Sequence, residues 1–134
     1  MPKFSKNLLK LGIDEVYVIH EAIIKQAGTK AFVRDFSLLH SAVERPYATY
    51  EGQDLYPTIF LKAGAILQSI CLNHPFTDGN KRTAWLSAKR FLWINGYHLS
   101  SHTKDTVDFM LNVDNKHPKL VEISLWLKKH SKAL

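Results

Sequence analysis

Cysteine is almost missing from this sequence, and so are long apolar runs. The single cysteine, Cys71, excludes an internal disulfide framework and a metal site built from several cysteines. No segment approaches the roughly eighteen consecutive apolar residues of a membrane span. Residues 1–6 lack the apolar stretch of a secretory signal. We therefore expect a cytoplasmic protein with no membrane contact, and we find neither a repeat nor a low-complexity tract.

Acidic residues are also scarce: 12 Asp and Glu stand against 18 Lys and Arg, for a formal net charge of +6. Such a charge suits an anionic ligand or partner without choosing one. A nucleic-acid module would more often interleave basic residues with exposed aromatics on one face. Here the lysines instead gather near the ends, which is typical of solvated termini and gives no reason to expect direct nucleic-acid binding. The clustered residues are Lys3, Lys6 and Lys10 at the start and Lys128, Lys129 and Lys132 at the finish.

What is present is the composition of an ordinary globular domain, with 46% hydrophobic and 22% charged residues. The 134 residues fit one domain, 1–134, that buries one core. Cys71 stands among apolar residues, so we interpret it as part of that core. The segment 1–11 allows either a short strand or an irregular lead.

Apolar residues at helical spacing predict an all-α domain of about six helices. The segment 81–95 is apolar nearly all round, so we expect it to be the central helix. Residues 47–57 are rich in Tyr, Gly, Glu and Asp, which predicts a loop or small hairpin. We expect an extended link at 97–101 and a polar turn at 112–118. The expected helices cover 12–28, 35–45, 58–73, 81–95, 103–113 and 120–130.

One stretch between two of these helices, His74 to Arg82, concentrates polar chemistry in a turn. Pro75 keeps His74 out of helical dihedral angles and cannot continue the helix itself, so the incoming helix must end near Asn73. Gly79 relaxes the backbone where the next helix begins. A helix start carries unpaired N–H groups and partial positive charge, so this turn predicts an anion cradle.

The side chains of the turn suit transfer of a phosphoryl or nucleotidyl group from a nucleotide. His74 is a candidate general base, because histidine exchanges protons readily near neutral pH. Asp78 is a hard carboxylate of the kind that binds magnesium beside substrate phosphates. Asn80, Lys81 and Arg82 are able to grip phosphate oxygens. Such chemistry depends on positioning and charge neutralisation, which this set supplies.

Other polar residues have simpler interpretations. We expect Phe76 to plug the core and His20 to be a structural or surface residue. For Arg34 and Arg45 we favour salt bridges to nearby acids over a ligand role. Four further histidines lack metal-ligand spacing, so we interpret them as surface residues: His98, His102, His117 and His130.

The turn resembles the signature of the Fic/Doc (Fido) family: His, any residue, Phe, any residue, an acidic residue, Gly or Ala, and Asn. The signature then ends in Gly-Arg in Fic adenylyltransferases and Lys-Arg in Doc toxins. Further segments resemble the death-on-curing (Doc) branch, so the resemblance covers about residues 11–130. The signature positions are His74, Phe76, Asp78, Gly79, Asn80, Lys81 and Arg82, and the further segments are Arg34-Asp35, Glu44-Arg45-Pro46, Asp54-Leu55-Tyr56-Pro57 and Asn95-Gly96-Tyr97.

This resemblance implies a single Fido-type orthogonal helical bundle with a small flap, in which Tyr50 to Tyr56 line the groove for the target peptide. It implies ATP and Mg²⁺ as cofactors, with Gly79 and the helix start cradling phosphate and Asp78 holding the metal. Doc toxins share the lysine at position 81 and are understood to bind ATP so that the γ-phosphoryl group faces a target hydroxyl. The implied activity is phosphorylation of a Ser or Thr, by resemblance in elongation factor Tu, which blocks translation.

Two alternatives remain open at this stage. Fic-type enzymes transfer AMP instead, but they carry Gly where this chain has Lys81, and an Arg where it has Trp85. The other alternative is a non-catalytic module that only binds an antitoxin or acts as its corepressor. If the chain is a Doc toxin, whether catalytic or only a binding module, the resemblance implies a Phd-like antitoxin as its partner. Nucleic acid would then be contacted only indirectly, through that antitoxin.

Overall fold

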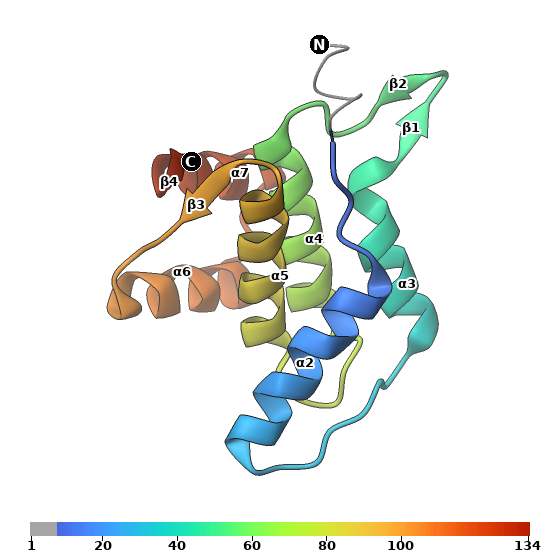
Figure 1. The fold of residues 1–134 in the computed structure, drawn as a ribbon, viewed down its shortest axis with the longest axis vertical. Coiled ribbons are helices and arrows are strands. Elements are labelled where there is room, and N and C mark those ends of the chain that lie inside the picture. Colours follow the sequence, from blue (N-terminus) through green and yellow to red (C-terminus); the bar gives the residue numbers. More distant parts are fainter. Residues whose placement is uncertain (1–7) are drawn as a thin grey trace.

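The computed structural model describes residues 8–134, which form six α-helices and two small antiparallel ribbons (Figure 1). This confirms the all-α prediction with a small hairpin. No helix of the described residues is long and apolar enough to cross a membrane. The helices are α2 (Ile13–Ala27), α3 (Phe36–Glu44), α4 (Ile59–Asn73), α5 (Asn80–Ile94), α6 (Thr103–Lys116) and α7 (Leu120–Lys129). A 3₁₀ turn, η1 (Arg45–Tyr47), precedes β1 (Thr49–Tyr50) and β2 (Gln53–Asp54); β3 (Tyr97–Leu99) pairs with β4 (Ser131–Ala133).

Local capping chemistry sets several helix ends where the sequence predicts them. The Asp35 carboxylate accepts a hydrogen bond from the Leu38 N–H at 3.0 Å and starts α3. The Thr58 hydroxyl accepts one from the Leu61 N–H at 3.1 Å and starts α4. Gly28 ends α2 in the left-handed conformation, with φ 70°.

Helix α4, not α5, is the central helix, and α5 and α7 pack against it (Figure 1). Ten of its fifteen residues are buried, against seven of fifteen in α5. The prediction that 81–95 would be most central was wrong, because the large apolar side chain of Trp93 is 48% exposed. Lys81, Arg82 and Arg90 also face solvent. Helix α5 therefore has one core face and one open face.

Arg45 fastens the turn after α3 onto α4. Its Nη1 donates to Gln68 Oε1 at 2.8 Å and to Ser69 Oγ at 2.9 Å, and its Nε donates to Tyr56 Oη at 2.9 Å. All of these acceptors are neutral. The predicted salt bridge of Arg45 with an acid was therefore wrong, and the guanidinium is instead satisfied by several hydrogen bonds at once.

The predicted hairpin in 47–57 is confirmed as β1 and β2, and a buried lysine holds it at the N-terminal end of α4. Lys62 is 4% exposed, and its Nζ donates to the Pro46 carbonyl at 3.1 Å and to Asp54 Oδ2 at 3.2 Å. A buried ammonium needs such partners to offset its desolvation.

The C-terminal third differs from the prediction in two places. Helix α6 continues to Lys116, so the polar turn is shorter than 112–118. The extended link after α5 forms β3 as expected, but its partner β4 follows α7 and was not predicted. Ribbon pairing joins segments more than thirty residues apart, which local periodicity does not reveal.

An aromatic cluster joins α5, α6 and α7. Trp126 stacks on Phe109 with centroids 3.8 Å apart and on His130 at 3.7 Å, and Trp85 meets Trp126 edge-on at 6.0 Å. His130 is thus partly buried, and its interpretation as a surface residue was wrong. The other three histidines without ligand spacing, His98, His102 and His117, are exposed as predicted.

Close packing between α4 and α7 leads to a stability prediction. A Cβ added at Gly64 would lie 3.1 Å from Leu120 Cδ1 and 3.5 Å from Ile123 Cγ2. Gly64→Val should therefore destabilise the fold by about 1–3 kcal/mol through overpacking. Denaturant unfolding followed by circular dichroism measures this. Ala22→Val, at an exposed site of α2, is the control and should cost about 0.5 kcal/mol; equal costs would contradict the packing argument.

Candidate active site

The loop from His74 to Gly79 joins α4 to α5 through two left-handed residues. His74 caps α4 with φ 49° and ψ 59°, and Gly79 precedes α5 with φ 79°. A non-glycine residue in this region costs about 1–2 kcal/mol, and such strain is concentrated at functional sites. A Cβ at Gly79 would also lie 3.2 Å from Ile24 Cδ1 of α2. The predicted breaks at Asn73 and Gly79 are confirmed.

The side chains of the stretch divide by exposure. One set is buried and shapes the loop, and the other faces solvent, where a ligand can reach it. The imidazole of His74 is 53% exposed, so it has a route to solvent. The buried residues are Pro75, Phe76 and Asn80, and the exposed ones are His74, Thr77, Asp78, Lys81 and Arg82.

The amide of Asn80 closes the loop on itself. Its Oδ1 accepts from the Phe76 N–H at 3.0 Å, and its Nδ2 donates to the Phe76 carbonyl at 2.9 Å. Sequence analysis assigned this amide to phosphate oxygens. The structure uses both of its polar atoms inside the loop, so the residue positions the loop while its backbone N–H remains at the helix start.

His20 of α2 packs against the buried side of the loop. It is 3% exposed, its ring stacks on Phe76 with centroids 3.7 Å apart, and its Nε2–H donates to the Asp78 carbonyl at 2.9 Å. The structural interpretation of His20 is confirmed and the surface one was wrong. A signal was present in the sequence, since His20 lies four residues after Val16 and three before Ile23, on the buried stripe of α2.

An extended segment before α3 runs along the loop. Val33 forms an isolated antiparallel bridge with Phe76, and the Thr77 N–H donates to the Phe32 carbonyl at 2.9 Å. The Phe32 N–H donates in turn to Thr77 Oγ1 at 3.0 Å. The loop thus pairs with residues 32–35 as a short irregular ribbon.

Arg34 in this segment binds the end of α4. Its Nε donates to the His74 carbonyl at 2.7 Å and its Nη2 to the Asn73 carbonyl at 2.9 Å. The last carbonyls of a helix are unpaired and carry partial negative charge, so a cation is favourable there. The predicted salt bridge of Arg34 with an acid was therefore wrong.

The β1–β2 hairpin does not lie beside this loop. It sits at the N-terminal end of α4, while His74 follows its C-terminal end (Figure 1). A fifteen-residue helix is about 22 Å long, so the two are well separated. The expectation that Tyr50 to Tyr56 line the groove for the target peptide stays a prediction, and the segment that lies along this loop is instead 32–35.

Asp78 has the right exposure for a metal that is shared with a ligand. Its Oδ1 accepts from the Gly79 N–H at 2.8 Å, and no hydrogen bond uses Oδ2 among the described residues. Within residues 8–134 no group of three or more His, Cys, Asp or Glu side chains is placed to hold a metal. One carboxylate together with substrate phosphates is the usual way in which proteins bind magnesium. The residues therefore fit a magnesium that arrives with a nucleotide.

The start of α5 supplies a cradle for anions. The first hydrogen bond of the helix runs from the Thr83 N–H to the Gly79 carbonyl at 3.0 Å. The N–H groups of Asn80, Lys81 and Arg82 precede it and point out of the helix end, where the helix dipole favours negative charge. The exposed side chains of Lys81 and Arg82 add two full charges there.

Asp114 of α6 belongs to the site and was not found from the sequence. Its Oδ1 lies 4.0 Å from His74 Nε2, and its Oδ2 lies 3.5 Å from Lys81 Nζ. The predicted helix ended at Val113, so Asp114 fell into an expected polar turn. Because it is more than thirty residues from either partner, no spacing rule connects them.

Cys71 of α4 is fully buried, and its thiol is unreactive at neutral pH. The pKa of its thiol is raised to about 11, first by burial and then by the charge of Asp114, while the charge of Lys81 lowers it. Below that pKa the thiol stays protonated, and the thiolate is the nucleophilic form. The interpretation of Cys71 as a core residue is confirmed by its 0% exposure.

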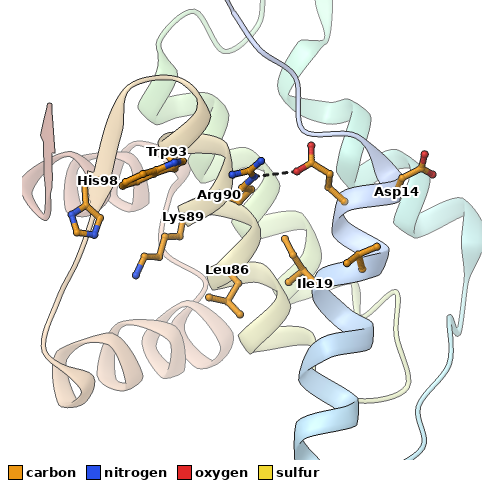
Figure 2. A pocket seen from close by; sticks show the side chains of 9 residues that line it. Asp14, Ile19, Leu86, Lys89, Arg90, Trp93 and His98 are labelled. Atoms are coloured by element: carbon orange, nitrogen blue, oxygen red, sulfur yellow. Dashed lines mark hydrogen bonds and ion pairs between the residues drawn. The ribbon is translucent and has the colours of Figure 1, made fainter. Parts of the chain in front are cut away.

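Two hollows lie along α5, and one of them starts in the first turn of this helix, directly after the loop. A groove of about 460 Å³ between α5 and α6 begins at Lys81 and Arg82 and continues over Trp85 and Met110. A larger hollow of about 660 Å³ lies between α2 and α5 and is lined by no residue from His74 to Arg82 (Figure 2). An ion pair joins Arg90 Nε to Glu15 Oε2 at 3.1 Å across this hollow, and a dashed line from Arg90 marks it in Figure 2. The groove between α5 and α6 is therefore the one that extends the site.

Comparisons with known proteins agree with this geometry. The model of the Fic/DOC family matches residues 10–92, which include the loop and most of α5. The chain is also similar to Toxin Doc of Mycolicibacterium smegmatis, with 52% identity over 80 residues. That match covers 56% of this chain and 62% of the relative, so it spans less than two thirds of the relative's length. With more than half of its residues matched by the family model, the chain belongs to the Fic/DOC family.

Proposed function

We propose that this chain is a Doc-like toxin that transfers the γ-phosphoryl group of ATP to a Ser or Thr hydroxyl of a target protein. Elongation factor Tu is the proposed target, and arrest of translation is the proposed outcome. The observation that carries the proposal is the exposed His74 in the same short loop as Asp78 and the basic start of α5. Its relative named Toxin Doc supports the same reading.

In this mechanism His74 is the general base. It takes the proton of the target hydroxyl as the hydroxyl oxygen forms a bond to the γ-phosphorus. The bond between that phosphorus and the β,γ-bridging oxygen breaks, and ADP leaves with the electron pair. Lys81, Arg82 and the N–H groups of α5 bind phosphate oxygens and neutralise the charge that develops. Asp78 would hold Mg²⁺, which would supply positive charge that offsets the negative charge of the phosphates.

Two positions favour γ-phosphoryl transfer over AMP transfer. Lys81 fills the space that a glycine leaves open in Fic adenylyltransferases, so the inner phosphates have less room at the cradle. Trp85 stands where those enzymes carry an arginine, and it is packed edge-on against Trp126. Position 85 therefore supplies no cation. AMP transfer is the second candidate.

The surroundings of the loop suit a nucleotide on one side and a protein on the other. The groove between α5 and α6 combines an apolar floor with the hydroxyls of Ser101 and Thr106, which suits a nucleoside. Phe32 in the paired segment and Phe36 directly after it are 67% and 65% exposed. Large exposed aromatics next to a site favour a protein as the acceptor.

Label transfer separates the candidates. Purified chain with Mg²⁺ and an extract that contains elongation factor Tu should label a protein from γ-labelled ATP and not from α-labelled ATP. Label from the α position would instead establish AMP transfer. No label from either position, with purified elongation factor Tu added as a defined substrate, would reject transferase activity and leave a binding module.

Removing the imidazole tests the general base. His74→Ala should lower the transfer rate by about 100-fold to 10,000-fold, the range that general base catalysis contributes. Initial rates at saturating ATP measure this. The matched control is His40→Ala, an exposed histidine on α3, which should keep the wild-type rate. An unchanged rate in the His74 variant would reject the proposed role.

We also propose a Phd-like antitoxin as partner, with nucleic acid contacted only through it. The net charge of +6 suits an acidic antitoxin segment. A purely binding module is the remaining alternative, but the complete loop argues against a degenerate enzyme. Expression of the chain alone should arrest growth, and co-expression of a short acidic protein from the neighbouring reading frame should restore it and co-purify with the chain. Growth arrest that no neighbouring protein relieves would contradict the partner.

A further inference from the structure

Asp114 is held in an unusual setting for an acid. It lies in the last turn of α6, where the helix dipole disfavours negative charge, and its side chain is only 23% exposed. Its neighbour Val113 is fully buried, and the stack of Phe109 on Trp126 fixes the same helix. Helix α6 thus offers the Asp114 carboxylate little stabilisation. The favourable partner of this carboxylate lies on the neighbouring helix α5.

That partner is Lys81, whose ammonium lies 3.5 Å from Asp114 Oδ2. A lysine side chain has a flexible four-carbon stem and loses much rotamer freedom when its end is held. The Lys81 side chain is 46% exposed, so few packing contacts restrict it. The other oxygen of Asp114 faces the imidazole of His74 at 4.0 Å. One carboxylate therefore faces two of the groups that the proposed transfer reaction uses.

We propose that Asp114 is a positioning residue that sets where the Lys81 ammonium lies beside His74, and that it does so at the expense of nucleotide affinity. This inference rests on the proposed function. A carboxylate beside the cation that phosphates need will repel them in the bound state. Binding energy given up in this way is compatible with faster transfer, because only interactions that favour the transition state raise the rate. Asp114 thus weakens ATP binding and speeds transfer.

The test compares nucleotide affinity with transfer rate in Asp114→Asn, which keeps the size of the side chain and removes its charge. Calorimetry with ATP and MgCl₂ should show a Kd about threefold to tenfold lower than that of the wild-type chain, since one repulsive charge is gone. The rate of γ-label transfer at saturating ATP should fall about tenfold or more, since Lys81 is no longer fixed. Asp114→Glu keeps the charge and should bind ATP more weakly than Asp114→Asn does.

The control is Asp108→Asn on the same helix, where the exposed carboxylate pairs with Lys104 at 3.1 Å. It should change neither Kd nor rate.

A purely structural role for Asp114 would weaken binding and transfer together, so a Kd equal to or higher than the wild-type value overturns the proposal. Thermal unfolding checks that each variant folds, and Asp114→Ala provides the same comparison should the Asn variant not fold. Because Kd does not depend on turnover, an inactive wild-type chain would refute the proposed function while the Kd comparison still decides the role of Asp114.

Discussion

The reciprocal hydrogen bonds between the amide of Asn80 and the backbone of Phe76 are the constraint on which the site depends. They tie the first residue of α5 to the middle of the loop, and they bury a polar side chain with both of its ends satisfied. Phe76 is held inward against His20, and the next two side chains, Thr77 and Asp78, face solvent. The backbone of the candidate site is thus held by a scaffold of buried partners, as preorganised sites require.

Three parts of the chain converge on that scaffold from different directions. His20 reaches the loop from α2, and residues 32–35 pair with it along its edge, where Arg34 of the same segment binds the end of α4. On the open side, α6 contributes Asp114. The loop is short, but its shape is determined by contacts that span most of the domain. This explains how two left-handed residues are sustained within six positions.

Prediction from the sequence worked where the determining forces are local. Pro75 and Gly79 defined the ends of the loop, and Asp35 and Gly28 marked helix ends. It failed where partners are distant or packing decides. Arg34 and Arg45 found carbonyls and neutral side chains instead of acids, because helix ends and buried amides lay nearer. Helix α4 is the central helix because α5 and α7 pack against it, and such packing cannot be read from the apolar pattern of one segment.

The contact between Gly79 and Ile24 has an evolutionary consequence. The family signature admits alanine at this position, but here an added methyl group would meet the Ile24 side chain and would also require left-handed backbone. A relative with alanine therefore needs a smaller or displaced residue on the facing helix. Positions 79 and 24 therefore depend on each other, because each restricts which amino acid the other tolerates. A loop transferred from one homologue to another without its matching α2 residue would not keep its conformation.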